Sequence, residues 1–152
     1  MPPKFTKTLA ERLNGMCPLE VKEAEDSEQV RPNVIYIAPG GFHLKLRNNG
    51  IKGVQINVTT EPSTTLHRPA VDIMMNSVID VYGKHTLGVI MTGMGKDGFE
   101  AIKNLKALGG YSIAQDEESC VVYGMPKAIV DAGLADFVVP LEKIPEIINR
   151  IV

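Results

Sequence analysis

The second half of the chain alternates short apolar segments with amphipathic ones, and this alternation constrains the fold more than any other feature. Short apolar runs are typical of buried strands, and apolar residues repeated every three or four positions are typical of helices. The predicted strands are 86–92, 111–114 and 137–139, and the helices that follow them are 99–108, 125–132 and 141–152. Strands that alternate with helices are joined by right-handed crossovers, which makes the strands parallel. We therefore expect an α/β fold with a mostly parallel, doubly wound sheet in three layers.

The first half of the chain adds an antiparallel element to this plan. Residues 42–47 and 54–58 alternate apolar and polar side chains, and Asn48-Asn49-Gly50 between them favours a turn. This pattern predicts a hairpin. Helical spacing predicts helices at 5–13 and 71–81, and short apolar runs predict strands at 19–21 and 34–38.

Length and composition are those of one soluble domain, 1–152. Sixteen Lys and Arg against 18 Asp and Glu give a net charge of −2, which argues against nucleic acid as the main partner. The longest apolar runs are about five residues, too short to insert into a membrane, and the N-terminus lacks the apolar region of a signal peptide. Two cysteines exclude a disulfide framework and a Cys-only zinc site. We expect a cytoplasmic protein.

The turn after the strand at 86–92 is the first place to look for chemistry, because ligands bind at the carboxyl ends of parallel strands. Its glycines, Gly93, Gly95 and Gly98, match the Gly-x-Gly-x-x-Gly pattern between a strand and a helix. Asp116 lies about 20 residues further on, as in dinucleotide-binding folds. A dinucleotide-binding module is therefore one alternative. Against it, Asp97 would place a carboxylate beside the pyrophosphate.

Asp97 gives the same turn a second interpretation. A carboxylate at the start of a helix is held ionised by the helix dipole, and an ionised Asp can orient a histidine during acyl transfer. Backbone N–H groups in the turn, such as that of Met94, could donate to an oxyanion. The simpler alternative is that Asp97 only caps its helix.

Segments spread over the whole chain carry a stronger signal than this turn alone. The sequence resembles the catalytic domain of the CheB-type protein-glutamate methylesterases of bacterial chemotaxis. The matching segments are Met1-Pro2-Pro3-Lys4-Phe5-Thr6, Leu9-Ala10-Glu11-Arg12-Leu13, Val34-Ile35-Tyr36-Ile37-Ala38-Pro39-Gly40-Gly41, His43-Leu44, His67-Arg68-Pro69-Ala70-Val71-Asp72, Gly88-Val89-Ile90-Met91-Thr92-Gly93-Met94-Gly95-Lys96-Asp97-Gly98, Ala114-Gln115-Asp116-Glu117 and Ser119-Cys120-Val121-Val122-Tyr123-Gly124-Met125-Pro126. This resemblance takes precedence over the dinucleotide interpretation.

The resemblance implies a serine hydrolase that demethylates glutamates and deamidates glutamines on the cytoplasmic helices of chemoreceptors, with no metal or organic cofactor. It implies that Asp97 is the Asp of a Ser-His-Asp triad and that the loop Gly93, Met94 and Gly95 lies on the oxyanion side. His67 and Arg68 would form a loop on the substrate side.

The resemblance also places the family's Ser and His upstream of the position of Met1. The first strand, first helix and second strand of the family's domain, and the receiver domain that normally precedes it in cis, would lie upstream as well. We therefore expect these 152 residues to lack the first strand-helix-strand portion and to be inactive alone.

The chain offers no obvious replacement for the missing groups. None of its five serines lies in a Gly-x-Ser-x-Gly elbow. His43, His67 and His85 are expected to be structural or solvated, Cys120 to be an inert thiol, and the three histidines have no metal-ligand spacing. The alternative outside enzymology is a non-catalytic remnant that still binds receptor.

Overall fold

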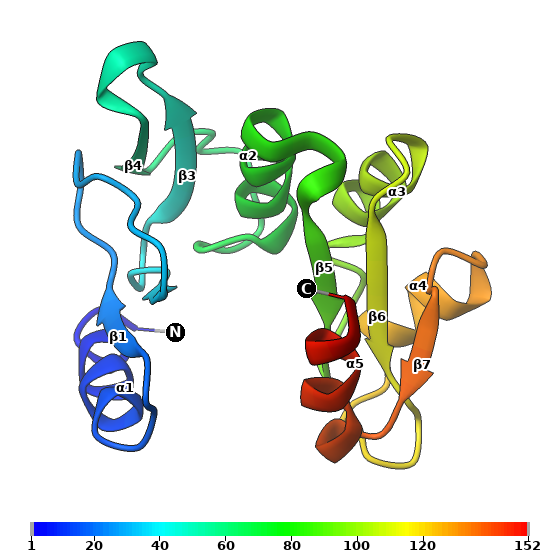
Figure 1. Ribbon diagram of the computed structural model, residues 1–152. Coiled ribbons are helices and arrows are strands. Elements are labelled where there is room, and N and C mark those ends of the chain that lie inside the picture. The colour runs from blue at the N-terminus through cyan, green and yellow to red at the C-terminus, as the bar shows by residue number, and fades with distance from the viewer. Residues whose placement is uncertain (1, 152) are drawn as a thin grey trace. The chain divides into compact units, whose positions relative to one another are not determined.

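A computed structural model describes residues 2–151 of the chain, which divide into two compact units, Met1–Val81 and Tyr82–Val152 (Figure 1). Each unit has its own sheets and its own buried apolar residues.

The first unit contains two small sheets and two helices. Its elements are α1 Phe5–Asn14, β1 Glu20–Glu23, β2 Val34–Ile37, β3 His43–Asn48, β4 Val54–Thr59 and α2 Val71–Tyr82, whose last residue crosses the boundary. β1 and β2 are parallel, and β3 and β4 form the predicted antiparallel hairpin. The hairpin connection is longer than the expected three-residue turn. It holds a 3₁₀ turn at Gly50–Lys52, and the Asn49 N–H donates to the Gly53 carbonyl at 2.8 Å.

Alternation decides which hairpin side chains are buried. Leu44 and Ile56 share one face, because Leu44 lies opposite Val58 and side chains two apart along a strand share a face. They are 5% and 0% exposed and pack with Ala24, Tyr36 and Met74. The hairpin therefore carries the core of this unit.

The second unit has the predicted parallel order. Its elements are β5 Leu87–Ile90, α3 Phe99–Ala107, β6 Tyr111–Gln115, α4 Met125–Asp131, β7 Phe137–Val139 and α5 Ile144–Ile151. The three strands are parallel in the order β5-β6-β7 and lie side by side (Figure 1). On α3, Ile102 and Leu105 are fully buried, as the helical spacing predicts, and so is Ala101. Leu108, which the same spacing places on the apolar stripe, is 52% exposed just after the helix ends. Ile113 of β6 packs with Ile144 and Ile147 of α5.

The last helix begins later than predicted. The structure has a 3₁₀ turn at Leu141–Lys143 and starts α5 at Ile144, one residue before Pro145. Proline has no N–H and is tolerated only in the first turn of a helix, so Pro145 favours a start at this point. Residue 152, the predicted end, lies outside the described residues.

The α/β class is confirmed, but among residues 2–151 the strands form three small sheets instead of one. Two are parallel and one is antiparallel. A sheet is continuous only where neighbouring strands exchange backbone hydrogen bonds. Among these residues β1 pairs with β2 and β3 pairs with β4, while β5, β6 and β7 form the third sheet.

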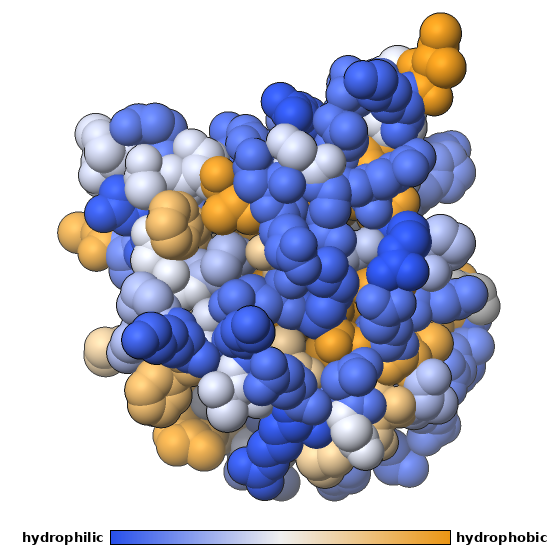
Figure 2. Space-filling view, turned by 90° about the vertical axis from the view of Figure 1, so that its left-hand side faces the viewer, coloured by the Kyte–Doolittle hydropathy of each residue, from blue (hydrophilic) through white to orange (hydrophobic). Residues whose placement is uncertain are grey.

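The surface drawn in Figure 2 is mostly hydrophilic, with apolar patches between the hydrophilic residues. Among the described residues, no helix is both long and apolar enough to cross a membrane.

Candidate active site

The Gly-rich turn follows the carboxyl end of β5, as expected. Gly98 is the N-cap of α3 and has φ 94°, a left-handed conformation that favours glycine. The Phe99 N–H donates to the Lys96 carbonyl at 3.1 Å and closes the turn. Asp97, half-buried, therefore directly precedes the N-cap position. The positive end of the α3 dipole favours the ionised form of its carboxyl.

A second segment, 119–124, holds this turn from one side. The Gly93 N–H donates to the Val122 carbonyl at 3.0 Å, and Gly93 forms a parallel bridge with Tyr123. The N–H groups of Gly124 and Met125 both donate to the Gly93 carbonyl, at 3.1 and 2.9 Å. The start of α4 is thus tied to the first residue of the turn.

The two segments are too close for a side chain at Gly124. A Cβ there would lie 2.7 Å from the Gly93 carbonyl oxygen and 3.0 Å from the Gly95 nitrogen. The backbone of the turn is therefore fixed by direct backbone contact as well as by hydrogen bonds.

A buried amide connects both segments to the end of β6. Gln115 is 1% exposed; its Oε1 accepts from the Thr92 N–H at 2.8 Å, and its Nε2 donates to the Ser119 carbonyl at 2.8 Å. Ser119 Oγ donates to Asp116 Oδ1 at 2.6 Å. The Thr92 hydroxyl accepts from the Val122 N–H at 2.9 Å. A buried polar network that is satisfied in this way fixes the geometry of the groups it connects.

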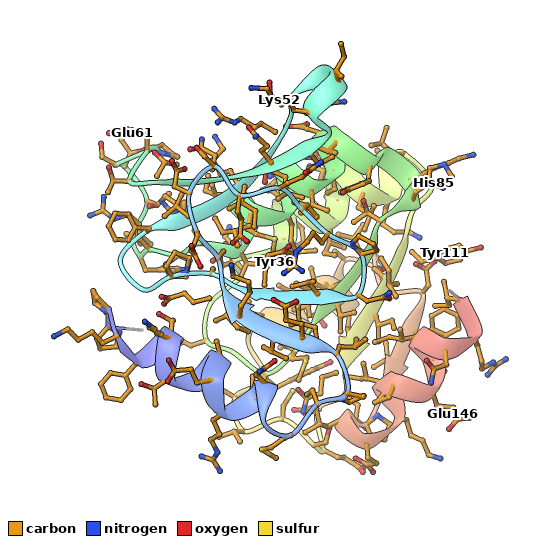
Figure 3. All side chains as sticks on the ribbon, turned by 60° about the vertical axis from the view of Figure 1, so that its left-hand side comes forward. Tyr36, Lys52, Glu61, His85, Tyr111 and Glu146 are labelled. Atoms are coloured by element: carbon orange, nitrogen blue, oxygen red, sulfur yellow. The ribbon has the colours of Figure 1, made fainter. Side chains whose placement is uncertain are left out.

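His67 and Arg68 lie in the first unit, within the irregular segment 60–70, whose other end is marked by Glu61 in Figure 3. Both are exposed. Arg68 Nη1 donates to the Thr60 carbonyl at 3.2 Å, and the Arg68 carbonyl accepts from the Gly41 N–H at 3.4 Å. The other predicted site residues lie in one turn of the second unit, namely Gly93, Met94, Gly95 and Asp97.

His43 anchors the segment that carries His67 and Arg68. It is fully buried, its Nδ1 accepts from the Ala70 N–H at 3.3 Å, and its Nε2 lies 3.1 Å from Thr65 Oγ1. An Nδ1 that accepts from a backbone N–H carries no proton, so Nε2 is the donor to Thr65. His43 therefore has the structural role that the sequence predicts.

His85 lies at the other end of the second unit's sheet. It precedes β5 and, with Lys84 and Tyr111, lines a pocket of about 300 Å³. His85 and Tyr111 are labelled in Figure 3. This pocket is at the amino ends of β5 and β6, whereas the Gly-rich turn follows the carboxyl end of β5.

Cys120 lies in the segment that holds the turn. Burial raises the pKa of the half-buried Cys120 thiol, which disfavours the nucleophilic thiolate. Residues 2–151 contain no group of three His, Cys, Asp or Glu side chains placed to hold a metal ion.

Comparison with known proteins shows the family of this chain. The sequence profile described as "CheB methylesterase" matches residues 1–148. The chain belongs to the CheB methylesterase family. It is 54% identical over 148 residues to a protein-glutamate methylesterase/protein-glutamine glutaminase of Lawsonia intracellularis, covering 96% of this chain and 41% of the relative. A relative of the same description from Pyrococcus abyssi is 45% identical over 152 residues, covering 100% of this chain and 41% of the relative.

The fold agrees with the same family. The chain is similar to the crystal structure of the Thermotoga maritima CheB methylesterase catalytic domain, with a TM-score of 0.94 and 46% identity. That match covers 100% of this chain and 80% of the solved chain. The chain therefore spans less than half of the curated relatives' length but most of a solved catalytic domain.

Sequence reasoning singled out Asp97 and its turn but missed the groups that hold the turn. Hydrogen bonds of the Gln115 side chain connect Thr92, after β5, with Ser119, after β6. The backbone of Gly124 lies so close to the turn that a Cβ there would clash with it. One sequence signal was available: Gln115 is a polar residue that directly follows the apolar pair Ile113-Ala114 of a buried strand.

Proposed function

We propose that residues 1–152 belong to the catalytic domain of a protein-glutamate methylesterase and protein-glutamine glutaminase, and that they supply the Asp side of its active site. The carrying observation is the family's Gly-Met-Gly-x-Asp-Gly turn, held at the carboxyl end of β5 by the Gly93–Tyr123 bridge. Family membership and the relatives' names support this activity. In the whole domain the strands would complete one doubly wound sheet.

The substrates in this proposal are methylated glutamates and certain glutamines on the cytoplasmic helices of chemoreceptors. The protein would act in the cytoplasm, and a receiver domain in cis would regulate it. His67 and Arg68, on the exposed segment 60–70, would face the substrate.

The proposed reaction is acyl transfer in two steps. The triad's His and Ser come from family sequence that precedes the position of Met1. The His takes the Ser proton as the Ser oxygen attacks the ester carbonyl, and the same proton then leaves with methanol. Water, deprotonated by the His, attacks the acyl-enzyme and releases glutamate and the free Ser. With a glutamine side chain, ammonia leaves in place of methanol.

Asp97 and the turn have separate parts in this mechanism. The Asp97 carboxylate holds the His in the tautomer that accepts the Ser proton and stabilises the imidazolium that forms. Backbone N–H groups of the turn, Met94 foremost, donate to the oxyanion. A backbone held in place before the reaction loses no energy to reorganisation as charge develops.

Asp97→Asn tests this proposal in the product of the complete reading frame. We expect methanol release from methylated receptor to fall by roughly 10⁴-fold, because an amide holds the wrong tautomer of the His. Asp131→Asn is the matched control, since Asp131 is exposed and pairs only at the surface with Lys127, at 3.2 Å. Equal methanol release by Asp97→Asn and wild type would remove Asp97 from the triad. No methanol release from wild type would reject the activity itself.

A further inference from the structure

Three apolar side chains, one in the candidate turn and two in the neighbouring segment, are exposed to solvent. Met94 is 86% exposed, Val121 is 91% exposed and Val122 is 45% exposed. Met94 lies in the turn, and the two valines lie in the segment hydrogen-bonded to it. We call these three residues the apolar rim. Single exposed apolar residues are normal at protein surfaces, but three on two connected segments beside a candidate site point to a contact surface.

The apolar rim is displayed by a held backbone. The Val122 N–H donates to Thr92 Oγ1 at 2.9 Å, and the Val122 carbonyl accepts from the Gly93 N–H at 3.0 Å. Thr92 is held in turn by Gln115, the buried amide at the end of β6. These bonds prevent the segment from turning its valines inward without breaking the network.

Charged residues of both signs lie near the same segment: acidic residues directly precede it, Lys96 is an exposed cation of the turn, and Lys127 Nζ lies 6.0 Å from the centre of the Tyr123 ring. Asp116, Glu117 and Glu118 directly precede it, and Glu117 and Glu118 are exposed. The pKa of Cys120 is raised by burial and, to a smaller extent, by Asp116 and Glu117. The pKa of Tyr123 is also raised by burial and then by Glu117, although Lys127 opposes this effect. The potential of the acidic residues therefore reaches both ends of the 120–123 segment.

An apolar surface beside acidic residues discriminates between the substrate and the product of demethylation. A glutamyl methyl ester is neutral and ends in a methyl group, whereas the product is a carboxylate. The ester loses little by leaving water for an apolar contact, but a carboxylate loses its hydration and is also repelled by acidic neighbours.

We propose that the apolar rim is a specificity-determining surface that binds the neutral ester-bearing helix of the substrate and disfavours the ionised glutamate product. This inference rests on the proposed function. Its physical consequence is that the enzyme binds methylated receptor more tightly than demethylated receptor, so that product leaves after each turnover.

Binding measurements on the complete gene product carrying Asp97→Asn test the surface without turnover. A chemoreceptor cytoplasmic fragment is titrated in its methylated form and in its glutamate form, and the ratio of the two dissociation constants is compared between variants. Val121→Ser should weaken binding of the methylated form by about fourfold to fifteenfold, the value of one or two buried apolar groups. Val121→Lys should bring the ratio to one or reverse it, because it adds a cation that favours the carboxylate.

Ile51→Ser is the control, because Ile51 is a fully exposed apolar residue at the tip of the hairpin in the first unit. It should leave the ratio unchanged. A ratio that is the same in wild type, Val121→Ser and Val121→Lys overturns the proposal. Methanol release by the protein with Asp97 intact is a separate measurement: if it occurs and the ratio does not respond, the apolar rim is rejected and the methylesterase function stands.

Discussion

Gly124 should be among the least replaceable small residues of the second unit, and Gly124→Ala tests how tightly the turn is held. Its φ of −106° is open to alanine, so the substitution brings no backbone strain of its own. The new Cβ would lie 2.7 Å from the Gly93 carbonyl oxygen, whereas ordinary contact begins at 3.4 Å. The turn and the start of α4 must therefore separate by about 0.7 Å, the difference of these distances.

Both stability and activity should respond to that displacement. Overpacking of this kind costs about 1–3 kcal/mol, which lowers the melting temperature by roughly 3–10 °C in a domain of this size. A shift approaching 1 Å in a positioned catalytic group lowers turnover by up to about 10²-fold. Thermal unfolding followed by circular dichroism and methanol release, both on the complete gene product, measure the two effects.

Gly15→Ala provides the matched control for Gly124→Ala. Gly15 has φ −72° at the end of α1, and a Cβ there would meet its nearest atoms at 3.6 and 3.9 Å. We expect it to be neutral or more stable by about 0.4–1 kcal/mol, because alanine reduces the entropy of the unfolded chain. If Gly124→Ala melts and turns over like wild type, the close contact between the two segments is refuted.

Two further predictions concern the groups around the turn. Gln115→Leu should destabilise the protein by about 1–3 kcal/mol, since the Thr92 N–H and the Ser119 carbonyl lose their partner. Urea titration measures this change, and the control Gln29→Leu, at an exposed position, should change the free energy of unfolding by no more than about 0.5 kcal/mol. Equal effects of the two substitutions would contradict the role of Gln115. For Asp136, burial raises the pKa of the carboxyl, but hydrogen bonds from Lys106 and Ser112 outweigh it and hold the pKa below its ordinary value of 3.8. The stability from Asp136 is therefore present above that value and lost as the pH falls through the lower native pKa. Asp136→Asn should be less stable than wild type at pH 7 and should approach wild type in acid, and a difference independent of pH would contradict this assignment.

Much of the local structure of this protein could be predicted from its sequence. Helical spacing at Ile102 and Leu105, and alternation at Leu44 and Ile56, depend only on the period of each element, so these residues were placed correctly. The turn that carries Asp97 could also be predicted, because its glycines and its position between a strand and a helix are local features.

The groups that hold that turn in place could not be predicted from the sequence. Thr92 and Val122 are 30 residues apart in the chain yet exchange hydrogen bonds, and Gln115 reaches Thr92 across two parallel strands. The division of the strands into three sheets also depends on pairing between segments distant in the chain. Periodicity specifies which face of an element is buried, but which strands become neighbours depends on contacts between distant residues, and these exist only in the folded chain.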